Sequence, residues 1–287
     1  MAIDPHALIR LPIPSTRTDY AARDAALYAL GVGTGFDPLD PAQLVYLVGE
    51  QPRILPSFAT VLGYEGFWAE DPATGIDTSA VLHASQRVTI HRPLPASGSV
   101  TRDNAILGVT DKGEGRGALV RLREHVRDAA SRELLATLES AVMCTADGGC
   151  GDAGEPVVRQ PLVPISHPDI CVDIATSPQQ ALLYQLSGDR YPLHLDPEVA
   201  QRAGFDRPIL QGLSTFGAAC RVLVASLCDN DPERMTMQEC RFTGVVFPGD
   251  RLRLELWPIN PGEARYRVRL VNRDAVALDD GLFRWRA

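Results

Sequence analysis

The sequence has almost no lysine, no closely spaced pair of cysteines and no long apolar run. Lys112 is the only lysine, and the formal net charge of -8 argues against a nucleic-acid binder, which usually carries a basic surplus. The six cysteines form no CxxC pair, so we expect reduced thiols. No apolar run approaches the ~20 residues of a membrane-spanning helix, and residues 1–6 lack the order of a secretory signal. These features predict a cytoplasmic protein that does not enter a membrane.

The composition predicts a sizeable hydrophobic core, because 45% of the 287 residues are apolar and 22% are charged. A glycine-rich stretch at 146–156 is the best candidate for a boundary. We therefore expect an N-terminal unit at 1–145, a linker at 146–160 and a C-terminal unit at 161–287. Each half has the same order of helix and then antiparallel strands, which indicates a diverged internal duplication.

Local patterns predict the individual elements. Helices are expected at 18–30, 55–63 and 208–226. Strands are expected at 83–91, 104–111, 117–128, 133–144, 170–175, 235–242, 251–257, 266–273 and 281–286.

The stretch from Tyr184 to Pro197 combines a carboxylate and an imidazole, Asp189 and His194, with a proline between them. Pro192 disfavours helix in the residue before it, and Gly188 allows a backbone turn. Asp189 and His194 are therefore expected on a bent segment that directs both side chains into one cleft. Asp196 has the position of a helix N-cap, followed by a short helix at 197–203 that ends at Gly204.

Other polar residues have simpler interpretations. A single Asp near a single His is, on its own, more often a structural hydrogen bond or a cap than a catalytic pair. His83, His91 and His125 lie on predicted strands, where structural roles are more common. The cluster at 167–171 contains metal-ligand types, but one isolated cluster is weak evidence for a metal site.

The stretch at 184–194 also resembles the signature of the (R)-specific enoyl-CoA hydratases, known as hydratase 2 or MaoC-like enzymes. The resemblance continues through 203–205, 208–217 and 247–250. In the first half, residues 23–33, 55–58 and 92–98 resemble the two-domain version of this family. The resemblance therefore covers most of the chain.

This resemblance implies an α+β double hotdog fold, two units that each have a long helix wrapped by an antiparallel sheet. It implies that the C-terminal unit carries the chemistry and that the N-terminal unit, which has no counterpart of Asp189 and His194, makes room for a bulky acyl chain. No metal or redox cofactor is implied, since CoA is part of the substrate. The family usually has Asn where this chain has Tyr191 and His where it has Gln211, two positions expected to contact substrate.

Further roles follow from the chemistry of the residues. Asp189 and His194 are expected to act as base and acid through one water. The backbone N–H of Gly212, at the start of a buried helix, is expected to stabilise a developing oxyanion. Arg190, Arg207 and Arg241 are candidates to contact CoA phosphates.

The expected activity is reversible hydration of trans-2-enoyl-CoA thioesters to (3R)-3-hydroxyacyl-CoA. One alternative is a dehydratase of another hydroxyacyl thioester, such as a small or dicarboxylic one. Another is a non-catalytic acyl-CoA-binding protein, in which Tyr191 and Gln211 mark a decayed site. A homodimer is the default expectation for the assembly.

Overall fold

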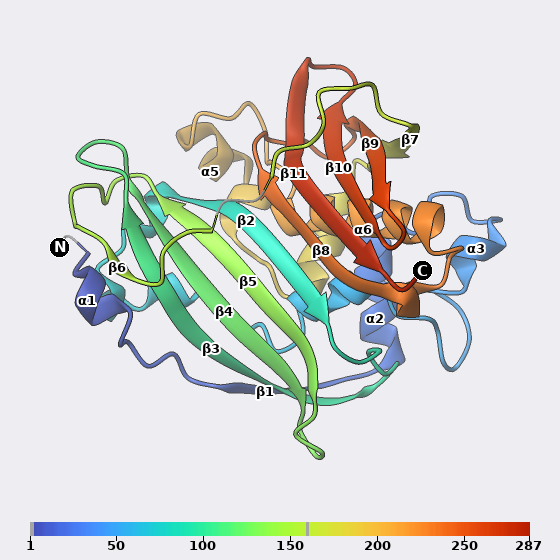
Figure 1. The fold of residues 1–287 in the computed structure, drawn as a ribbon, viewed down its shortest axis with the longest axis horizontal. Helices are drawn as coiled ribbons and strands as arrows, with labels where there is room; N and C mark the ends of the chain where they lie inside the picture. Colours follow the sequence, from blue (N-terminus) through green and yellow to red (C-terminus); the bar gives the residue numbers. More distant parts are fainter. Residues whose placement is uncertain (1–2, 159–160) are drawn as a thin grey trace.

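The strands form one large antiparallel sheet in the computed structural model, which describes residues 3–158 and 161–287. Its order is β1-β3-β4-β5-β2-β8-β11-β10-β9-β7, and a short strand β6 pairs with β3 (Figure 1). The strand bounds are β1 Thr16–Tyr20, β2 Val81–Ile90, β3 Gly98–Asp111, β4 Ala118–Asp128, β5 Leu134–Cys144, β6 Ala153–Gly154, β7 Ile170–Ala175, β8 Met235–Phe242, β9 Arg251–Asn260, β10 Glu263–Leu270 and β11 Ala275–Trp285.

The order of the strands has an internal symmetry. Strands β1 to β5 fill one half of the sheet and β7 to β11 fill the other, and the halves join where β2 pairs antiparallel with β8. Outward from this junction, both halves follow the same sequence of strands, β2-β5-β4-β3-β1 on one side and β8-β11-β10-β9-β7 on the other. This is the topology that two copies of one unit would give.

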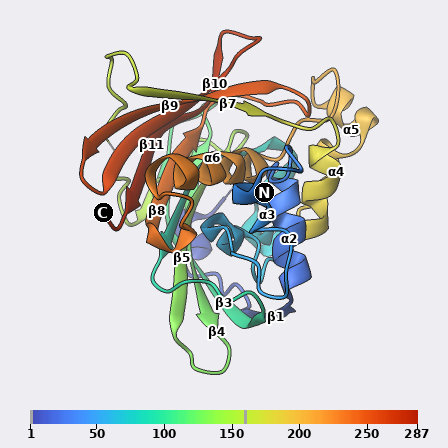
Figure 2. The same ribbon diagram turned by 90° about the vertical axis from the view of Figure 1, so that its right-hand side faces the viewer.

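The two halves differ in their helices. In the C-terminal half the sheet curves over α6 (Gly212–Leu227), a helix of 16 residues (Figure 2). In the N-terminal half, the predicted helix at 55–63 is only a 3₁₀ helix of five residues, η1 (Pro56–Thr60). The expectation of a long helix in each unit is therefore wrong for the first unit. There, the buried residues of η1 and of a separate helix, α2 (Ala22–Gly31), pack into the main core.

The remaining helical segments are short. The α-helices are α1 Pro5–Leu8, α3 Pro41–Leu44, α4 Gln180–Tyr184 and α5 Pro197–Arg202. The other 3₁₀ helices are η2 Trp68–Glu70, η3 Pro72–Thr74, η4 Thr78–Ala80, η5 Gln185–Ser187, η6 Pro192–His194 and η7 Pro232–Arg234. The predicted helix at 18–30 is wrong at its start, because residues 16–20 pair with β3 as strand β1.

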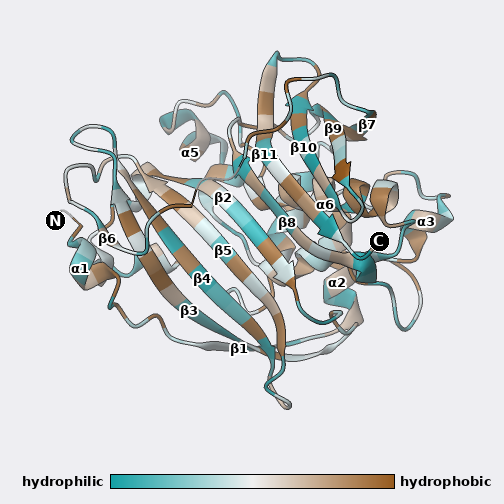
Figure 3. Ribbon diagram, in the orientation of Figure 1, coloured by the Kyte–Doolittle hydropathy of each residue, from teal (hydrophilic) through white to brown (hydrophobic). Residues whose placement is uncertain are grey.

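The strands alternate buried and more exposed residues, as expected for a sheet with one face on the core. In β4, Val120, Leu122 and Val126 are buried, and the arginines between them lie on the more exposed face (Figure 3). One large core extends through both halves, and a smaller second core lies under β3 to β5 beside α1.

The halves meet in a close contact between helices. A Cβ on Gly31 of α2 would lie 2.9 Å from Cα of Tyr184 in α4, so only glycine fits there. Ser214 of α6 donates its hydroxyl to the carbonyl of Gly31 at 2.9 Å, and the Gln180 amide donates to Ser214 at 2.9 Å. The two halves are therefore closely packed at this point.

The glycine-rich stretch after β5 is anchored to the N-terminal half. Ala153 and Gly154 pair with Val109 and Gly108 of β3. The carboxylate of Asp111 accepts hydrogen bonds from backbone N–H groups of this stretch. All six cysteines are free thiols. Among the helices of residues 3–158 and 161–287, none has the length and apolarity to cross a membrane.

Candidate active site

The segment carrying Asp189 is a sharp bend between two 3₁₀ turns. Helix η5 ends at Ser187 and is followed by Gly188, whose φ of +119° lies in a region that residues with a side chain rarely adopt. Asp189 follows and accepts the backbone N–H of Tyr191 through Oδ1 at 3.3 Å. Helix η6 then ends at His194. Both side chains thus lie on bent backbone, as the glycine and proline predict.

His194 is held by the backbone that leads into α6. Its Nδ1 lies 2.9 Å from the carbonyl oxygen of Ile209. Because a carbonyl only accepts, Nδ1 carries the proton and Nε2 of the neutral ring has a free lone pair. Burial lowers the pKa of His194, while the charge of Asp189 and the Ile209 carbonyl partly oppose this effect. The imidazole is therefore a neutral base at neutral pH.

Asp189 and His194 lie close enough for their charges to interact. The Asp189 carboxylate opposes the effect of burial on the pKa of His194. Burial raises the pKa values of Tyr64 and Tyr184, and the charge of Asp189 adds to both effects. In the described ranges, the pair itself makes no direct hydrogen bond. This arrangement suits two groups that act on a molecule between them.

The predicted helix at 208–226 begins later than expected, at Gly212. Leu210 donates its N–H to the carbonyl of Val246 at 2.7 Å, which holds residues before the helix in an extended form. Gln211 is the N-cap and is fully buried. Its Nε2 donates to the carbonyl of Ala181 at 3.3 Å, and its Oε1 has no partner in the parts of the chain described.

Gly212 faces an aromatic ring. A Cβ at this position would lie 3.1 Å and 3.2 Å from two ring atoms of Phe242, so packing alone favours glycine here. As the first residue of α6, Gly212 has an N–H group without an acceptor inside the helix. The position is thus compatible with the predicted oxyanion role.

His83 adjoins this site, although the strand pattern favoured a structural role. A bulge in the pairing of β2 with β5 follows His83, and bulges redirect side chains. The His83 ring lies 4.6 Å from the ring of Phe242 between centroids, and its Nε2 donates to the Ser85 carbonyl at 3.0 Å. Burial lowers the pKa of His83 to about 4. No local sequence signal connects His83 with Phe242, since the contact joins the two halves.

The other predicted residues lie near the surface. Tyr191 is 37% exposed, and its ring centroid lies 6.1 Å from that of His194. Arg190 and Arg207 are exposed, and neither forms an ion pair within the described residues. Arg241 instead pairs with Asp280 at 2.8 Å, so the structure does not support a role for it as a free phosphate ligand.

Arg207 belongs to a small cationic platform beside the site. Its guanidinium carbon lies 4.9 Å from the centroid of the Phe247 ring, and that of Arg273 lies 4.8 Å from the same centroid. Arg273 forms an ion pair with Asp250, whereas Arg207 forms none among the described residues. Arg207 is two residues before Ile209, which places the platform next to the residue that holds His194.

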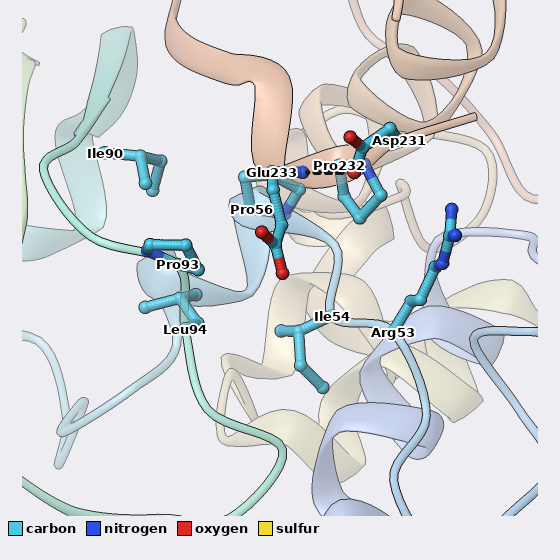
Figure 4. A pocket seen from close by; sticks show the side chains of 9 residues that line it. All are labelled: Arg53, Ile54, Pro56, Ile90, Pro93, Leu94, Asp231, Pro232 and Glu233. Atoms are coloured by element: carbon cyan, nitrogen blue, oxygen red, sulfur yellow. Dashed lines mark hydrogen bonds between the residues drawn. The ribbon is translucent and has the colours of Figure 1, made fainter. Parts of the chain in front are cut away.

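A separate cavity of about 300 Å³ opens where the two halves meet beyond the end of α6. Figure 4 shows its lining, residues Arg53, Ile54, Pro56, Ile90, Pro93, Leu94, Asp231, Pro232 and Glu233. None of the predicted site residues lines it. No group of three or more metal-ligating side chains occurs in residues 3–158 and 161–287, so the 167–171 cluster gains no support as a metal site.

The fold defines the class of protein. A Mycobacterium tuberculosis protein described as having a double hotdog fold superposes with a TM-score of 0.56 at 17% identity, covering 94% of this chain and 92% of that one. A MaoC-like dehydratase from Phytophthora capsici superposes with a TM-score of 0.86 at 29% identity, with 98% of each chain covered. The predicted double hotdog fold is thus confirmed.

Sequence comparison specifies the family. Residues 19–146 match the MFE-2 hydratase 2 N-terminal domain, and residues 154–277 match the MaoC like domain. A 3-hydroxyacyl-thioester dehydratase Y of Mycobacterium tuberculosis is 38% identical over 290 residues, with 98% of both chains covered. The enoyl-CoA hydratase ChsH3 of the same organism is 37% identical over 261 residues, with 90% of both chains covered. The chain belongs to the family of two-domain MaoC-like dehydratases and hydratase 2 enzymes.

Proposed function

We propose that this protein is a hydro-lyase that reversibly hydrates trans-2-enoyl-CoA thioesters to (3R)-3-hydroxyacyl-CoA, with Asp189 and His194 as its acid–base pair. The observation that carries the proposal is the hydrogen bond from His194 Nδ1 to the Ile209 carbonyl, which leaves a basic Nε2 near the Asp189 carboxylate. The family membership supports the same reaction class.

In the proposed reaction, one water supplies both groups that are added. Its oxygen bonds to C3 as a proton passes to His194 Nε2, and a proton from the pair is delivered to C2. The carbon–carbon double bond becomes a single bond, so the atoms of water appear as the C3 hydroxyl and the C2 hydrogen. Asp189 holds the water and stabilises the imidazolium while it exists. Positioned acid–base groups typically contribute about 10²–10⁴-fold to rate.

Negative charge develops on the thioester oxygen during this step. The N–H of Gly212 is the proposed donor, because the start of a 16-residue helix presents free N–H groups and the positive end of the helix dipole. Removing a donor of this kind from other enzymes costs about 10²–10³-fold in kcat. Gln211 directly precedes Gly212, and the Tyr191 ring centroid lies 6.1 Å from that of His194. Both residues are proposed to contact the substrate.

The two halves are proposed to divide the work. The C-terminal unit supplies Asp189, His194 and Gly212. Among the described residues, the N-terminal unit has no helix as long as the 16 residues of α6, since α2 has 10 residues and η1 has five. We assign the acyl chain to this side, and the CoA moiety to the exposed face with Arg190 and Arg207.

The test is hydration of a panel of 2-enoyl-CoA esters, from short to bulky, followed by loss of the absorbance of the conjugated thioester. Asp189→Asn and His194→Ala are measured in parallel, and the hand of the product is determined. Turnover to the (3R) product that both substitutions abolish would establish the reaction and the site together. If the folded protein binds CoA esters without hydrating any, the proposal is wrong and a binding protein becomes the better explanation.

A further inference from the structure

A buried ion pair in the N-terminal half fixes the chain just before Tyr64. Arg102 on β3 donates to Glu124 Oε1 on β4 from Nε at 2.9 Å and from Nη2 at 2.6 Å. Its Nη1 donates to the carbonyls of Thr60 and Leu62 at 3.0 Å and 3.1 Å. Arg102 and Glu124 are only 5% and 7% exposed, so this pair lies inside the protein.

A buried pair needs further hydrogen bonds to offset the loss of water, and the two carbonyls supply them here. The same segment is also held from β1, where the Thr16 hydroxyl donates to the carbonyl of Gly63 at 2.6 Å. Residues 60–63 therefore have three hydrogen bonds to strands of the N-terminal sheet. Tyr64 follows directly, so the backbone from which its side chain extends is held in place.

Tyr64 then reaches the other half of the molecule. Its Cδ1 atom lies 3.5 Å from the position of a Cβ on Gly188, and its carbonyl oxygen lies 3.8 Å from that position. The Arg102 guanidinium carbon lies 5.9 Å from the centroid of the Tyr64 ring. Burial raises the pKa of Tyr64, and the charge of Asp189 raises it further. The ring thus lies between the fixed arginine and the bend that carries Asp189.

We propose that Tyr64 is a positioning residue for Asp189, and that the buried Arg102–Glu124 pair holds its ring in place. The inference rests on the proposed function of Asp189 and assigns a role in catalysis to the half that lacks an acid–base pair. Gly188 has a φ of +119°, one of the many conformations open to a residue without a side chain, so the groups packed against it decide which one the bend adopts. Without the ring, the bend can relax and Asp189 can move away from the reacting water.

The first test is the pair of variants Tyr64→Ala and Tyr64→Phe, assayed with the ester that the wild type hydrates best. A small displacement of a catalytic group can cost about 10²-fold, so we expect kcat of Tyr64→Ala to fall about 10- to 100-fold. KM of Tyr64→Ala should change less than about threefold, because Tyr64 is not proposed to hold the substrate. Tyr64→Phe should retain the kcat of the wild type, because the ring does the positioning. Unchanged kcat in Tyr64→Ala would overturn the proposal. Equal losses in both variants would also overturn it, since the hydroxyl would then be the active group.

Amide hydrogen exchange provides a readout that does not require activity. The N–H of Gly188 donates to the Gln185 carbonyl at 3.0 Å, and the N–H of Tyr191 donates to Asp189. Both amides should exchange faster in Tyr64→Ala, while those in the middle of α6 keep their rates. If the wild type hydrates no ester, the proposed function fails, but this exchange result still decides whether Tyr64 orders the bend.

The second variant replaces the ion pair without leaving a lone buried charge. Arg102→Met combined with Glu124→Leu substitutes apolar residues of similar volume, a change that proteins often tolerate. We expect lower kcat and faster Gly188 exchange, in the same direction as Tyr64→Ala. If kcat and the exchange rate of the Gly188 amide both keep their wild-type values, Arg102 does not hold Tyr64. Phe67→Ala is the matched control, because Phe67 lies in the same loop but packs on Trp68 and the smaller core, and it should keep wild-type kcat.

Discussion

The imidazole of His194 donates from Nδ1 to the carbonyl oxygen of Ile209, 2.9 Å away. Ile209 lies three residues before α6, so one short segment orients the imidazole of His194 and leads to Gly212. Because both groups depend on this segment, the hydrogen bond to Ile209 ties the position of the imidazole to the start of α6. This relationship allows a direct test by titration.

We expect the His194 imidazole to titrate below the ordinary histidine value of about 6.5. Burial lowers its pKa, and the Asp189 charge opposes this, so Asp189→Asn should move the titration to still lower pH. NMR of the histidine ring measures the pKa of His194 in the wild type and in Asp189→Asn. In the wild type, the acid limb of the pH profile of kcat/KM should follow the pKa of His194. A higher pKa in Asp189→Asn would contradict the interaction between the two groups.

Gln211→Met should separate binding from stability. The Gln211 amide makes only a 3.3 Å bond to Ala181, whose carbonyl also accepts the Gln185 N–H, and Oε1 has no partner among the described residues. We therefore expect a loss below about 1 kcal/mol in the free energy of unfolding. kcat/KM should nevertheless fall about 5- to 150-fold if the amide contacts substrate, because a buried substrate group left without its partner costs about 1–3 kcal/mol.

Gln180→Met is the matched control for that change. Gln180 is equally buried, but both ends of its amide are bonded, to Ser214 and to the N–H of Ser177. Its replacement should destabilise the fold by about 1–3 kcal/mol and leave KM near the wild-type value. If Gln180→Met and Gln211→Met have the same effect on KM, Gln211 has no special role in binding.

Several features could be predicted from local sequence because local physics determines them. Strands β7 and β8 have the expected bounds, since their alternating residues pair within a regular sheet. The cap at Asp196 is confirmed, because its carboxylate accepts the N–H groups of Glu198 and Val199 as a capping aspartate does. The resemblance also identified the double hotdog fold.

Contacts between the halves could not be predicted in this way. His83 and Phe242 are far apart in sequence, and nothing in either strand indicates that their rings meet. The same is true of Tyr64 and Gly188. The shortening of the helix at 55–63 was also missed, because helix propensity in that segment is outweighed by the carbonyl bonds to Arg102 and the packing of buried η1.

Gly217→Ala should destabilise the contact between the halves. A Cβ at this position of α6 would lie 2.5 Å from Cγ1 of Val32 and 2.7 Å from the hydroxyl oxygen of Tyr28. Overpacking of this kind costs about 1–3 kcal/mol, which exceeds the gain of up to about 1 kcal/mol from better helix propensity. Urea unfolding measures the loss. Adding Val32→Ala should recover part of it, and additive losses in the double variant would show that Val32 is not the obstacle.

His83 should make the protein less stable in acid. Its pKa is about 4 in the folded protein, against about 6.5 when unfolded, so the unfolded state binds more protons between these values. Stability from this group is complete above about pH 6.5 and is lost as the pH falls toward 4, by about 2 kcal/mol between pH 7.5 and pH 5. Between the two pH values, the free energy of unfolding measured in urea should fall by about 2 kcal/mol less in His83→Phe than in the wild type. An equal loss in both proteins would mean that His83 does not titrate in this range.

Arg207→Gln should reveal which part of the substrate the cationic platform binds. Arg207 has no ion pair in the described parts of the chain, and its guanidinium lies over Phe247 next to the segment that orients His194. A phosphate bound there would lose a charge-assisted hydrogen bond, so KM for enoyl-CoA should rise about 10-fold or more with kcat unchanged. Enoyl-pantetheine, which has the same acyl and thioester groups but no nucleotide, should be hydrated equally well by both proteins. Arg202→Gln is the control, because Arg202 is also exposed but pairs with Glu198 on α5. If KM rises for both substrates, Arg207 shapes the site near the thioester; if it rises for neither, the nucleotide binds elsewhere.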